Sequence, residues 1–367
     1  MASFFIRIYV LKIEQPSLPT KEICCFVRFS LLWCEAFRLH TGFFRNIIET
    51  FRNTNKKFIA LIGTPVPAVT GIDIDDIANK LENTLNIPVF AFNTTGFENY
   101  ARGVSDAYLA LAKHYITSHG KKVQRSVNIL GATPLDIGSD HHLNMLTSLL
   151  ERAGLNVIAS WTMGCRFEDL CNSSYAEMNI VISHTALPLA QYMEEMYEIP
   201  YILSIPIGIH HSINLFALID EKIQGNLKLD LETPSEKNGP KLPEGTRALI
   251  IGEPVMSYCI KQCLITDFGV DEVRVASLFP LNNLPQIDHD TKDLYIEQEE
   301  DLGNLIEREH FDIIVGDPYY RSFIDKKKQL YFIPLPHLAL SGQDYCRSDY
   351  AYIGEQGYHY FCKSLFG

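Results

Sequence analysis

The chain has 367 residues, of which 47% are hydrophobic and 21% are charged, and its formal net charge is −12 at pH 7. This length and composition indicate a globular protein of two or three α/β domains. The acidic balance argues against nucleic acid or an anionic membrane surface as the main partner. No apolar run reaches the roughly 20 residues that a membrane span needs.

Residues 1–42 contain few structural signals, and we leave them unassigned. The first residues are hydrophobic, but Arg7 and Lys12 interrupt them and no small-residue cleavage site follows, so we expect no signal peptide. The chain has nine cysteines, with no pair of CxxC motifs at zinc spacing. Their odd number, without an export signal, predicts mostly reduced thiols in the cytoplasm.

Residues 43–120 predict a first Rossmann-like domain. Strand, sharp loop and helix follow one another here, which is the opening of a βαβ unit. Asp73 stands where a side chain would cap the following helix. In chain order, hydrophobic spacing predicts a helix at 44–51, a strand at 58–62, a helix at 74–85, a strand at 87–92 and a helix at 103–118.

The same alternation recurs twice downstream. Residues 121–225 predict a second domain, 226–245 a polar linker and 246–334 a third domain, while 335–367 are expected to complete the first. Expected strands lie at 126–131, 157–161, 178–182, 199–203, 247–252, 273–276 and 312–317, with helices of 10–15 residues between most of them. We therefore predict an α/β fold with three Rossmann-like domains, whose mainly parallel sheets are flanked by helices.

Short motifs give weak chemical signals. The chain has neither a GxGxxG nor a GxxxxGK[ST] motif, so no dinucleotide or nucleoside triphosphate is indicated. The runs Asp140–His142 and His210–His211 contain metal-ligating residue types, but adjacent histidines at a helix start point to different faces. Cys259 and Cys263 share one helix face, where core packing is the alternative to a ligand pair.

The residues at the ends of the predicted strands form the main candidate site. The carboxyl ends of parallel strands converge on a crevice, which is the usual ligand-binding position in α/β proteins. The chain's C-terminal part adds further side chains that would close over this crevice. The candidate cofactor-binding residues are Thr94, Thr95, Gly96, Phe97, Ser183, His184 and His337.

Several segments resemble the nitrogenase component 1 family, which comprises the molybdenum–iron protein subunits and their relatives. The run Thr64–Ile74 is similar to the family segment T-C-x-x-x-x-I-G-D-D-I. Further similar segments follow in the family's order, at Ile87–Val89 with Thr95–Phe97, Val127–Gly131, Ala176–Val181, Tyr192–Pro200 and Tyr352–Tyr358. The chain is thus identified as a divergent member with a shortened N-terminal domain, and the resemblance implies the same three-domain fold.

The departures from the family pattern concern the metal ligands. Pro65 stands where the resemblance implies a cysteine for the bridging iron–sulfur cluster, and Ser183 where it implies the cysteine that anchors the active-site cofactor. The cofactor histidine of the family corresponds to His337, or else the position falls on Asp344 or Cys346. Cys34 and Cys346 are the weak metal-ligand candidates. Iron–sulfur clusters normally need several thiolates, so we expect no nitrogen reduction by this chain alone.

The resemblance implies a subunit of an electron-accepting oxidoreductase complex. Such a subunit would work with a paralogous subunit that supplies most cluster ligands, and with an ATP-dependent iron–sulfur reductase. Its cofactor would be an iron–sulfur cluster or metallocofactor shared with that partner, although binding of no cofactor is also consistent with the sequence. The alternatives are a non-catalytic scaffold or metallocofactor carrier that kept the fold and lost the ligands, and a truncated gene product. The sequence identifies no catalytic residue.

Overall fold

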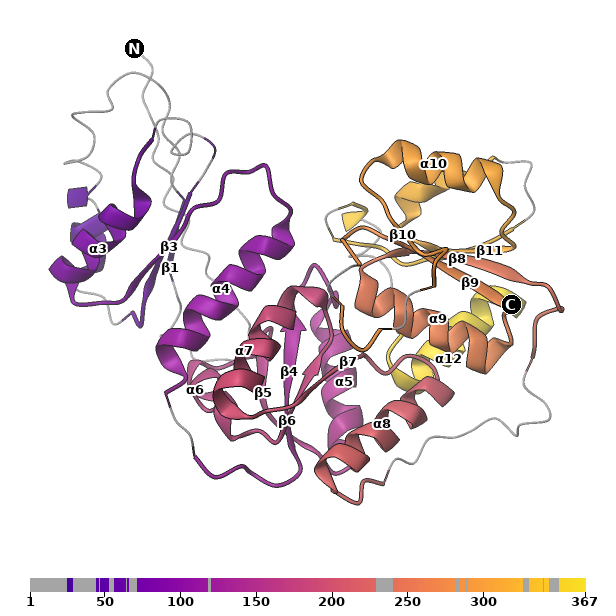
Figure 1. The fold of residues 1–367 in the computed structure, drawn as a ribbon, viewed down its shortest axis with the longest axis horizontal. Helices are drawn as coiled ribbons and strands as arrows, with labels where there is room; N and C mark the ends of the chain where they lie inside the picture. Colours follow the sequence, from indigo (N-terminus) through magenta and orange to yellow (C-terminus); the bar gives the residue numbers. More distant parts are fainter. Residues whose placement is uncertain are drawn as a thin grey trace, which may run out of the picture. The chain divides into compact units, whose positions relative to one another are not determined.

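Parallel β-sheets form the framework of the chain, and the described residues contribute to three of them (Figure 1). The chain divides into two units, Met1–Ala110 and Leu111–Gly367. The structure is a computed structural model, and it describes residues 25–28, 44, 45, 47–52, 56–63, 65, 71–117, 120–228, 240–281, 284–287, 290–325, 330–338, 340–342 and 350–367.

The first unit contains a sheet of strand order β1-β2-β3, in which both pairings are parallel. Residues 44, 45 and 47–51 are helical, as their spacing predicts. The other elements are β1 (Cys25–Arg28), β2 (Ile59–Ile62), α3 (Ile74–Leu85), β3 (Val89–Phe92) and α4 (Tyr100–Tyr115), which crosses the boundary between the units. β1 lies in the segment that the sequence left unassigned.

Helix α3 begins and ends where the sequence predicts, for reasons of local chemistry. The side chain of Asp73 accepts a hydrogen bond from the backbone N–H of Asp76 at 2.9 Å, which caps the first turn. Asn86 ends the helix in the left-handed conformation, with a φ of 54°. Apolar side chains of α3 pack with β2, β3 and the preceding helix in one core cluster, formed by Ile47, Phe51, Ile59, Leu61, Ile74, Ile77, Ala78, Leu81 and Val89.

The second unit contains a parallel sheet of strand order β5-β4-β6-β7. Both central strands are buried along their whole length, as is typical of parallel strands covered by helices on both faces. Its elements are β4 (Ser126–Ala132), α5 (Asp140–Arg152), β5 (Asn156–Thr162), α6 (Phe167–Cys171), η1 (Ser173–Tyr175), β6 (Met178–Val181), η2 (His184–Ala186), α7 (Leu187–Tyr197), β7 (Tyr201–Leu203) and α8 (His210–Ile223).

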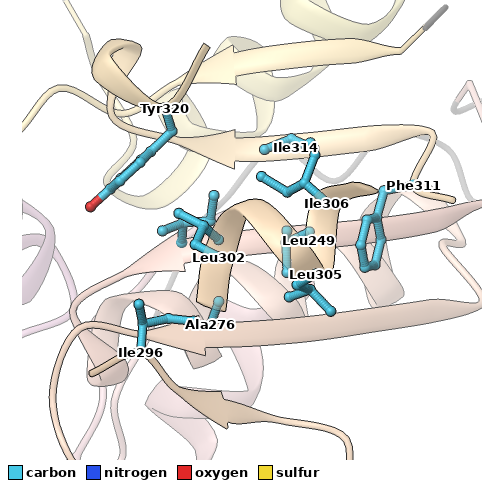
Figure 2. Close-up of a cluster of buried hydrophobic side chains, with 10 residues drawn as sticks. Leu249, Ala276, Ile296, Leu302, Leu305, Ile306, Phe311, Ile314 and Tyr320 are labelled. Atoms are coloured by element: carbon cyan, nitrogen blue, oxygen red, sulfur yellow. The ribbon is translucent and has the colours of Figure 1, made fainter. Parts of the chain in front are cut away.

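A second parallel sheet of this unit has the strand order β10-β9-β8-β11-β12. Helix α10 covers one face and α9 lies along the other (Figure 1). Figure 2 shows Leu302 and Ile306 of α10 packed beside Leu249 and Ile314 of the sheet. The elements are β8 (Arg247–Gly252), α9 (Pro254–Phe268), β9 (Glu272–Ser277), β10 (Leu294–Tyr295), α10 (Glu299–Arg308), β11 (Ile313–Gly316), η3 (Pro318–Phe323) and β12 (Tyr331–Pro334).

The C-terminal helix α12 (Gly354–Phe366) contacts β12 and α5 of the second unit. The ring of Tyr358 stacks on that of Phe268 in α9, with centroids 5.3 Å apart. The α/β fold with three mainly parallel, helix-flanked sheets that the sequence predicts is confirmed. The exact domain boundaries, including completion of the first domain by residues 335–367, stay predictions.

Gly208 lies where a side chain cannot be accommodated. Its φ is +75°, and a Cβ atom there would lie 2.2 Å from Oδ2 of Asp267 and 2.5 Å from Sγ of Cys263. Asp267 of α9 accepts hydrogen bonds from the backbone N–H groups of Ile209 at 2.9 Å and His210 at 3.0 Å, and so caps α8. The close approach of Gly208 therefore couples α8 of one sheet layer to α9 of the next.

We expect Gly208→Ala to destabilise the chain more than Gly154→Ala does. Gly154 also has a positive φ, +91°, but no atom lies within 4 Å of the position that a Cβ atom would take there. Gly154→Ala should lower the free energy of unfolding by about 1–2 kcal/mol, because of the backbone conformation alone. Gly208→Ala should have the same backbone cost and lose roughly 1–3 kcal/mol more through overpacking. Denaturant unfolding of both variants measures the difference, and equal losses would contradict the close approach.

Candidate functional site

Ser183 follows β6 and is completely buried. Its Oγ atom accepts a hydrogen bond from the backbone N–H of Thr185 at 3.2 Å and lies 2.9 Å from Oγ1 of Thr185. Thr185 Oγ1 donates to Oδ2 of Asp136 at 3.1 Å, so the proton between the two hydroxyls belongs to Ser183. The Ser183 hydroxyl is therefore engaged both as donor and as acceptor inside the chain.

The loop after β4 supports this turn from the neighbouring strand. The buried Asp136 also accepts a hydrogen bond from Oγ1 of Thr133 at 2.8 Å. Gly131 allows the close contact, because its φ is +93° and a Cβ atom there would lie 3.0 Å from Cβ of Ser183. The ends of β4 and β6 thus form one hydrogen-bonded unit, as convergence at the carboxyl edge of a parallel sheet requires.

His184 joins this turn to the neighbouring sheet. Its backbone N–H and its ring Nδ1 both lie 2.8 Å from Oε1 of Glu253, which follows β8. The other carboxylate oxygen of Glu253 accepts the backbone N–H of Met256 at 2.8 Å and caps α9. The imidazole packs against the ring of Phe279, with centroids 4.1 Å apart. Since a carboxylate only accepts hydrogen bonds, Nδ1 carries the ring proton.

The second ring nitrogen of His184, Nε2, is buried and has no hydrogen-bond partner among the described residues. In the neutral imidazole, a proton on Nδ1 leaves a lone pair on Nε2. An unsatisfied buried acceptor typically costs about 1–3 kcal/mol, and such atoms in folded proteins call for an explanation such as a ligand or a catalytic role. The site therefore offers one free nitrogen donor.

His337 follows β12 and is held by a buried carboxylate. Its backbone N–H donates to Oδ2 of Asp317 at 2.7 Å. Oδ1 of Asp317 accepts from Oγ of Ser341 at 2.6 Å and from the backbone N–H of Tyr319 at 2.8 Å. Burial lowers the pKa of His337, while the nearby negative charges of Asp136, Asp317 and Glu253 act in the opposite direction.

Three of the predicted site residues are thus brought into one neighbourhood of the second unit, namely Ser183, His184 and His337. We call them, with the three carboxylates that surround them, the His184 cluster. Its residues are Asp136, Ser183, His184, Glu253, Asp317 and His337. The carboxylates were not among the residues predicted from the sequence. The sequence did contain a signal for two of them, because Glu253 directly follows the predicted strand 247–252 and Asp317 is the last residue of the predicted strand 312–317.

The remaining predicted site residues form a turn of the first unit. Thr94 Oγ1 donates to the carbonyl of Gly63 at 2.6 Å, and Thr95 Oγ1 accepts the backbone N–H of Phe97 at 3.3 Å. Gly96 has a φ of +82°, and a Cβ atom there would lie 2.9 Å from Cγ of Pro65. The Phe97 side chain is 85% exposed. A crevice shared by this turn and the His184 cluster stays a prediction, and Cys34 and Cys346 lie outside the described residues.

The described residues contain no group of three or more His, Cys, Asp or Glu side chains arranged to hold a metal ion. His142 stacks on Tyr352, with ring centroids 4.2 Å apart, and contacts the carbonyl of Tyr350. Cys259 accepts the backbone N–H of Ile205 at 3.3 Å, and burial raises its pKa to about 11. Burial also raises the pKa of Cys263. These groups pack in the interior as neutral side chains.

Comparison with known proteins assigns the family. The model of the nitrogenase component 1 type oxidoreductases matches residues 42–354. The chain belongs to this family. One subunit of the light-independent protochlorophyllide reductase of Chlorobium chlorochromatii is 34% identical over 119 residues, which cover 32% of this chain and 22% of that protein. The nitrogenase molybdenum–iron protein alpha chain of Clostridium pasteurianum is 29% identical over 175 residues, covering 44% of this chain and 30% of the relative.

A further relative and a solved structure also match the chain. A protein of Clostridium pasteurianum named nitrogenase iron–molybdenum cofactor biosynthesis protein NifE is 25% identical over 201 residues, covering 52% of this chain and 42% of that protein. The solved structure of nitrogenase Cp1 at pH 6.5 superposes with a TM-score of 0.63 over 90% of this chain and 80% of that chain, at 15% identity, and supports the fold. The resemblance stated from the sequence is confirmed, although the matches span less than half the length of these curated relatives.

In this component 1 type chain, Asp317 is expected to hold the His337 segment in place. Asp317→Ala would leave three donors without their acceptor, and each buried donor left unpaired costs about 1–3 kcal/mol. Asp301→Ala, in the exposed first turn of α10, is the control and should cost no more than about 1 kcal/mol. Thermal unfolding of the two variants measures this, and similar midpoints would show that Asp317 does not anchor the segment.

Stability should also depend on the protonation of His142. Burial lowers its pKa to about 4, whereas an unfolded histidine titrates near 6.5. Between these pH values the unfolded chain binds more protons than the folded chain. The contribution of the neutral histidine to the free energy of unfolding is therefore complete above about pH 6.5 and is lost as the pH falls toward 4. The difference between 6.5 and about 4 corresponds to about 3 kcal/mol at 1.36 kcal/mol per pH unit.

The measurement compares unfolding free energies of the wild type and His142→Gln between pH 4 and pH 7. Glutamine retains a donor for the Tyr350 carbonyl and does not titrate. The difference between the two profiles should therefore change across this window, and the carboxylates common to both proteins cancel. Parallel profiles would contradict the buried, neutral state of His142.

No helix in the described part of the chain combines the length and apolar character that crossing a membrane requires.

Proposed function

We propose that the chain is one subunit of a multi-subunit oxidoreductase complex that accepts electrons from a separate ATP-dependent iron–sulfur reductase. Family membership supports an oxidoreductase role. Two relatives are named as one component of several, a subunit of a light-independent reductase and the alpha chain of a molybdenum–iron protein. In this proposal a paralogous subunit supplies most ligands of a shared iron–sulfur cluster or metallocofactor, and the complex works in the cytoplasm.

The state of Ser183 is the observation that carries the need for a partner. A thiolate at this position would bind iron, whereas the serine hydroxyl is a weaker ligand for soft metals. The Ser183 hydroxyl is moreover buried and engaged by Thr185 on both its donor and acceptor sides. Pro65 has no ligand atom at all. A cluster held by four side chains of the described residues does not fit this donor set.

A second candidate function is a non-catalytic scaffold or metallocofactor carrier. The engaged Ser183 hydroxyl favours it too, because a carrier must release its cargo and gains from having few strong ligands. One relative is named for biosynthesis of the iron–molybdenum cofactor. In this case the chain retains the pairing surface and the fold, while chemistry takes place elsewhere.

Anaerobic purification tests the proposal. The chain is expressed alone and together with a paralogous component 1 type subunit, and iron and acid-labile sulfide are measured in both preparations. We expect iron and sulfide in the complex, and little of either in the isolated chain, because cluster assembly needs the partner's thiolates. Electron transfer from an added ATP-dependent iron–sulfur reductase is then followed as ATP-dependent bleaching of the cluster absorbance.

Two outcomes separate the candidates. A complex that contains iron but accepts no electrons would favour the carrier function over the oxidoreductase. Colourless, iron-free protein in both preparations would contradict a shared metal centre and leave the scaffold. A Ser183→Ala variant serves as the matched control, because it should retain the wild-type iron content if the serine is not a ligand.

A further inference from the structure

The unpaired ring nitrogen of His184, Nε2, has the features of a metal-ligand atom. Nε2 is buried and unpaired among the described residues. Glu253 binds Nδ1 at 2.8 Å, which fixes the tautomer with the lone pair on Nε2. Histidines that bind metals almost always donate their other ring N–H to a carboxylate or a backbone carbonyl, an arrangement that orients the ring and raises its basicity.

The surroundings hold the ring in a single orientation. The same Glu253 oxygen binds the backbone N–H of His184, so ring and main chain are fixed by one acceptor. Phe279 packs against the ring, and the His184 side chain is only 13% exposed. Glu253 itself is held by the first turn of α9. A donor atom held this firmly loses little conformational entropy when it binds a ligand.

The charge of the neighbourhood favours a cation. The carboxylate of Glu253 contacts the ring of His184, and the carboxylate of Asp136 is bound to the same turn through Thr185. An anionic substrate would be repelled here, whereas a metal would be attracted. Imidazole nitrogen is a suitable ligand for iron.

We propose that Nε2 of His184 is the ligand that this chain supplies to the shared metal centre, in place of the thiolate expected at position 183. This inference rests on the proposed function. The bond forms by donation of the Nε2 lone pair to the metal, and no proton is released because Nε2 carries none. The remaining ligands come from the centre itself and from the paralogous subunit. Glu253 is a positioning residue, because it acts through His184.

The shift of the ligand by one residue follows from the local geometry. Ser183 caps η2, so its side chain turns back onto Thr185. His184 is the next residue, and its ring is drawn toward the other sheet by Glu253. The turn that would have presented a cysteine thus presents an imidazole. Since Nε2 is closed to solvent in the chain, we expect the metal to enter while the complex is assembled rather than afterwards.

The test uses the complete complex, loaded with metal during anaerobic co-expression. His184→Gln removes the ligand while keeping a similar volume. His359→Gln in α12, where the side chain is 61% exposed, is the matched control. Iron per complex is measured for each, and histidine labelled with nitrogen-15 is incorporated so that pulsed electron paramagnetic resonance of the reduced centre detects any bound imidazole nitrogen.

We expect the wild type and His359→Gln to show a strongly coupled histidine nitrogen, and His184→Gln to lose it together with iron, roughly 10-fold or more. Glu253→Gln should retain folding and reduce iron by a smaller factor, with an altered nitrogen coupling. Circular dichroism and co-purification of the partner check that each variant folds and assembles. If His184→Gln fails to assemble, His184→Phe, which matches the apolar contact with Phe279, replaces it.

The outcomes distinguish this inference from the proposed function. Iron present in the wild type and equally in His184→Gln, or a wild-type centre without a coupled histidine nitrogen, overturns the ligand role and leaves the shared centre intact. Absence of iron from the wild-type complex overturns both. Iron lost from His184→Gln while its partner stays bound supports the ligand role alone.

Discussion

The carboxylate of Glu253 is the contact on which the candidate site depends. It accepts the backbone N–H and ring Nδ1 of His184 from one sheet and the first turn of α9 from the other. A single buried side chain therefore joins two layers, which Asp267 also links through the first residues of α8. An ionised carboxylate is suited to this, because charge-assisted hydrogen bonds are shorter and stronger than neutral ones. The ends of β6 and β8 are thus linked at the site itself.

The fold was largely predictable because its signals are local. The apolar residues of α3 recur at helical spacing, and the capping residue Asp73 directly precedes the helix. The bounds of α3 therefore agree with the prediction. Elements without such local signals were not predicted. β1 lies in an apolar stretch without alternation, β10 has two residues, and β12 is a short edge strand. Their formation depends on partners distant in sequence, which periodicity does not encode.

The candidate site was predictable only in part. The strand-end rule identified Ser183 and His184 because it needs only strand positions, whereas His337 was added from the C-terminal part of the chain. The rule could not show that the Ser183 hydroxyl donates to Thr185 or that Nε2 of His184 is left unpaired among the described residues. Asp136 orients the hydroxyl of Thr185 from 49 residues away, and Glu253 binds His184 from 69 residues away. Loss of a recognised ligand thus says little about the residues beside it.

The two interior cysteines of α9 have a practical meaning for work with this chain. Cys259 and Cys263 are fully enclosed and their thiols stay protonated, because burial raises both pKa values. Alkylating reagents attack thiolates, so maleimide or iodoacetamide should spare these two while the native chain persists. The rate at which Cys259 and Cys263 become labelled would then report the rate of global opening of the second unit, independently of any bound metal.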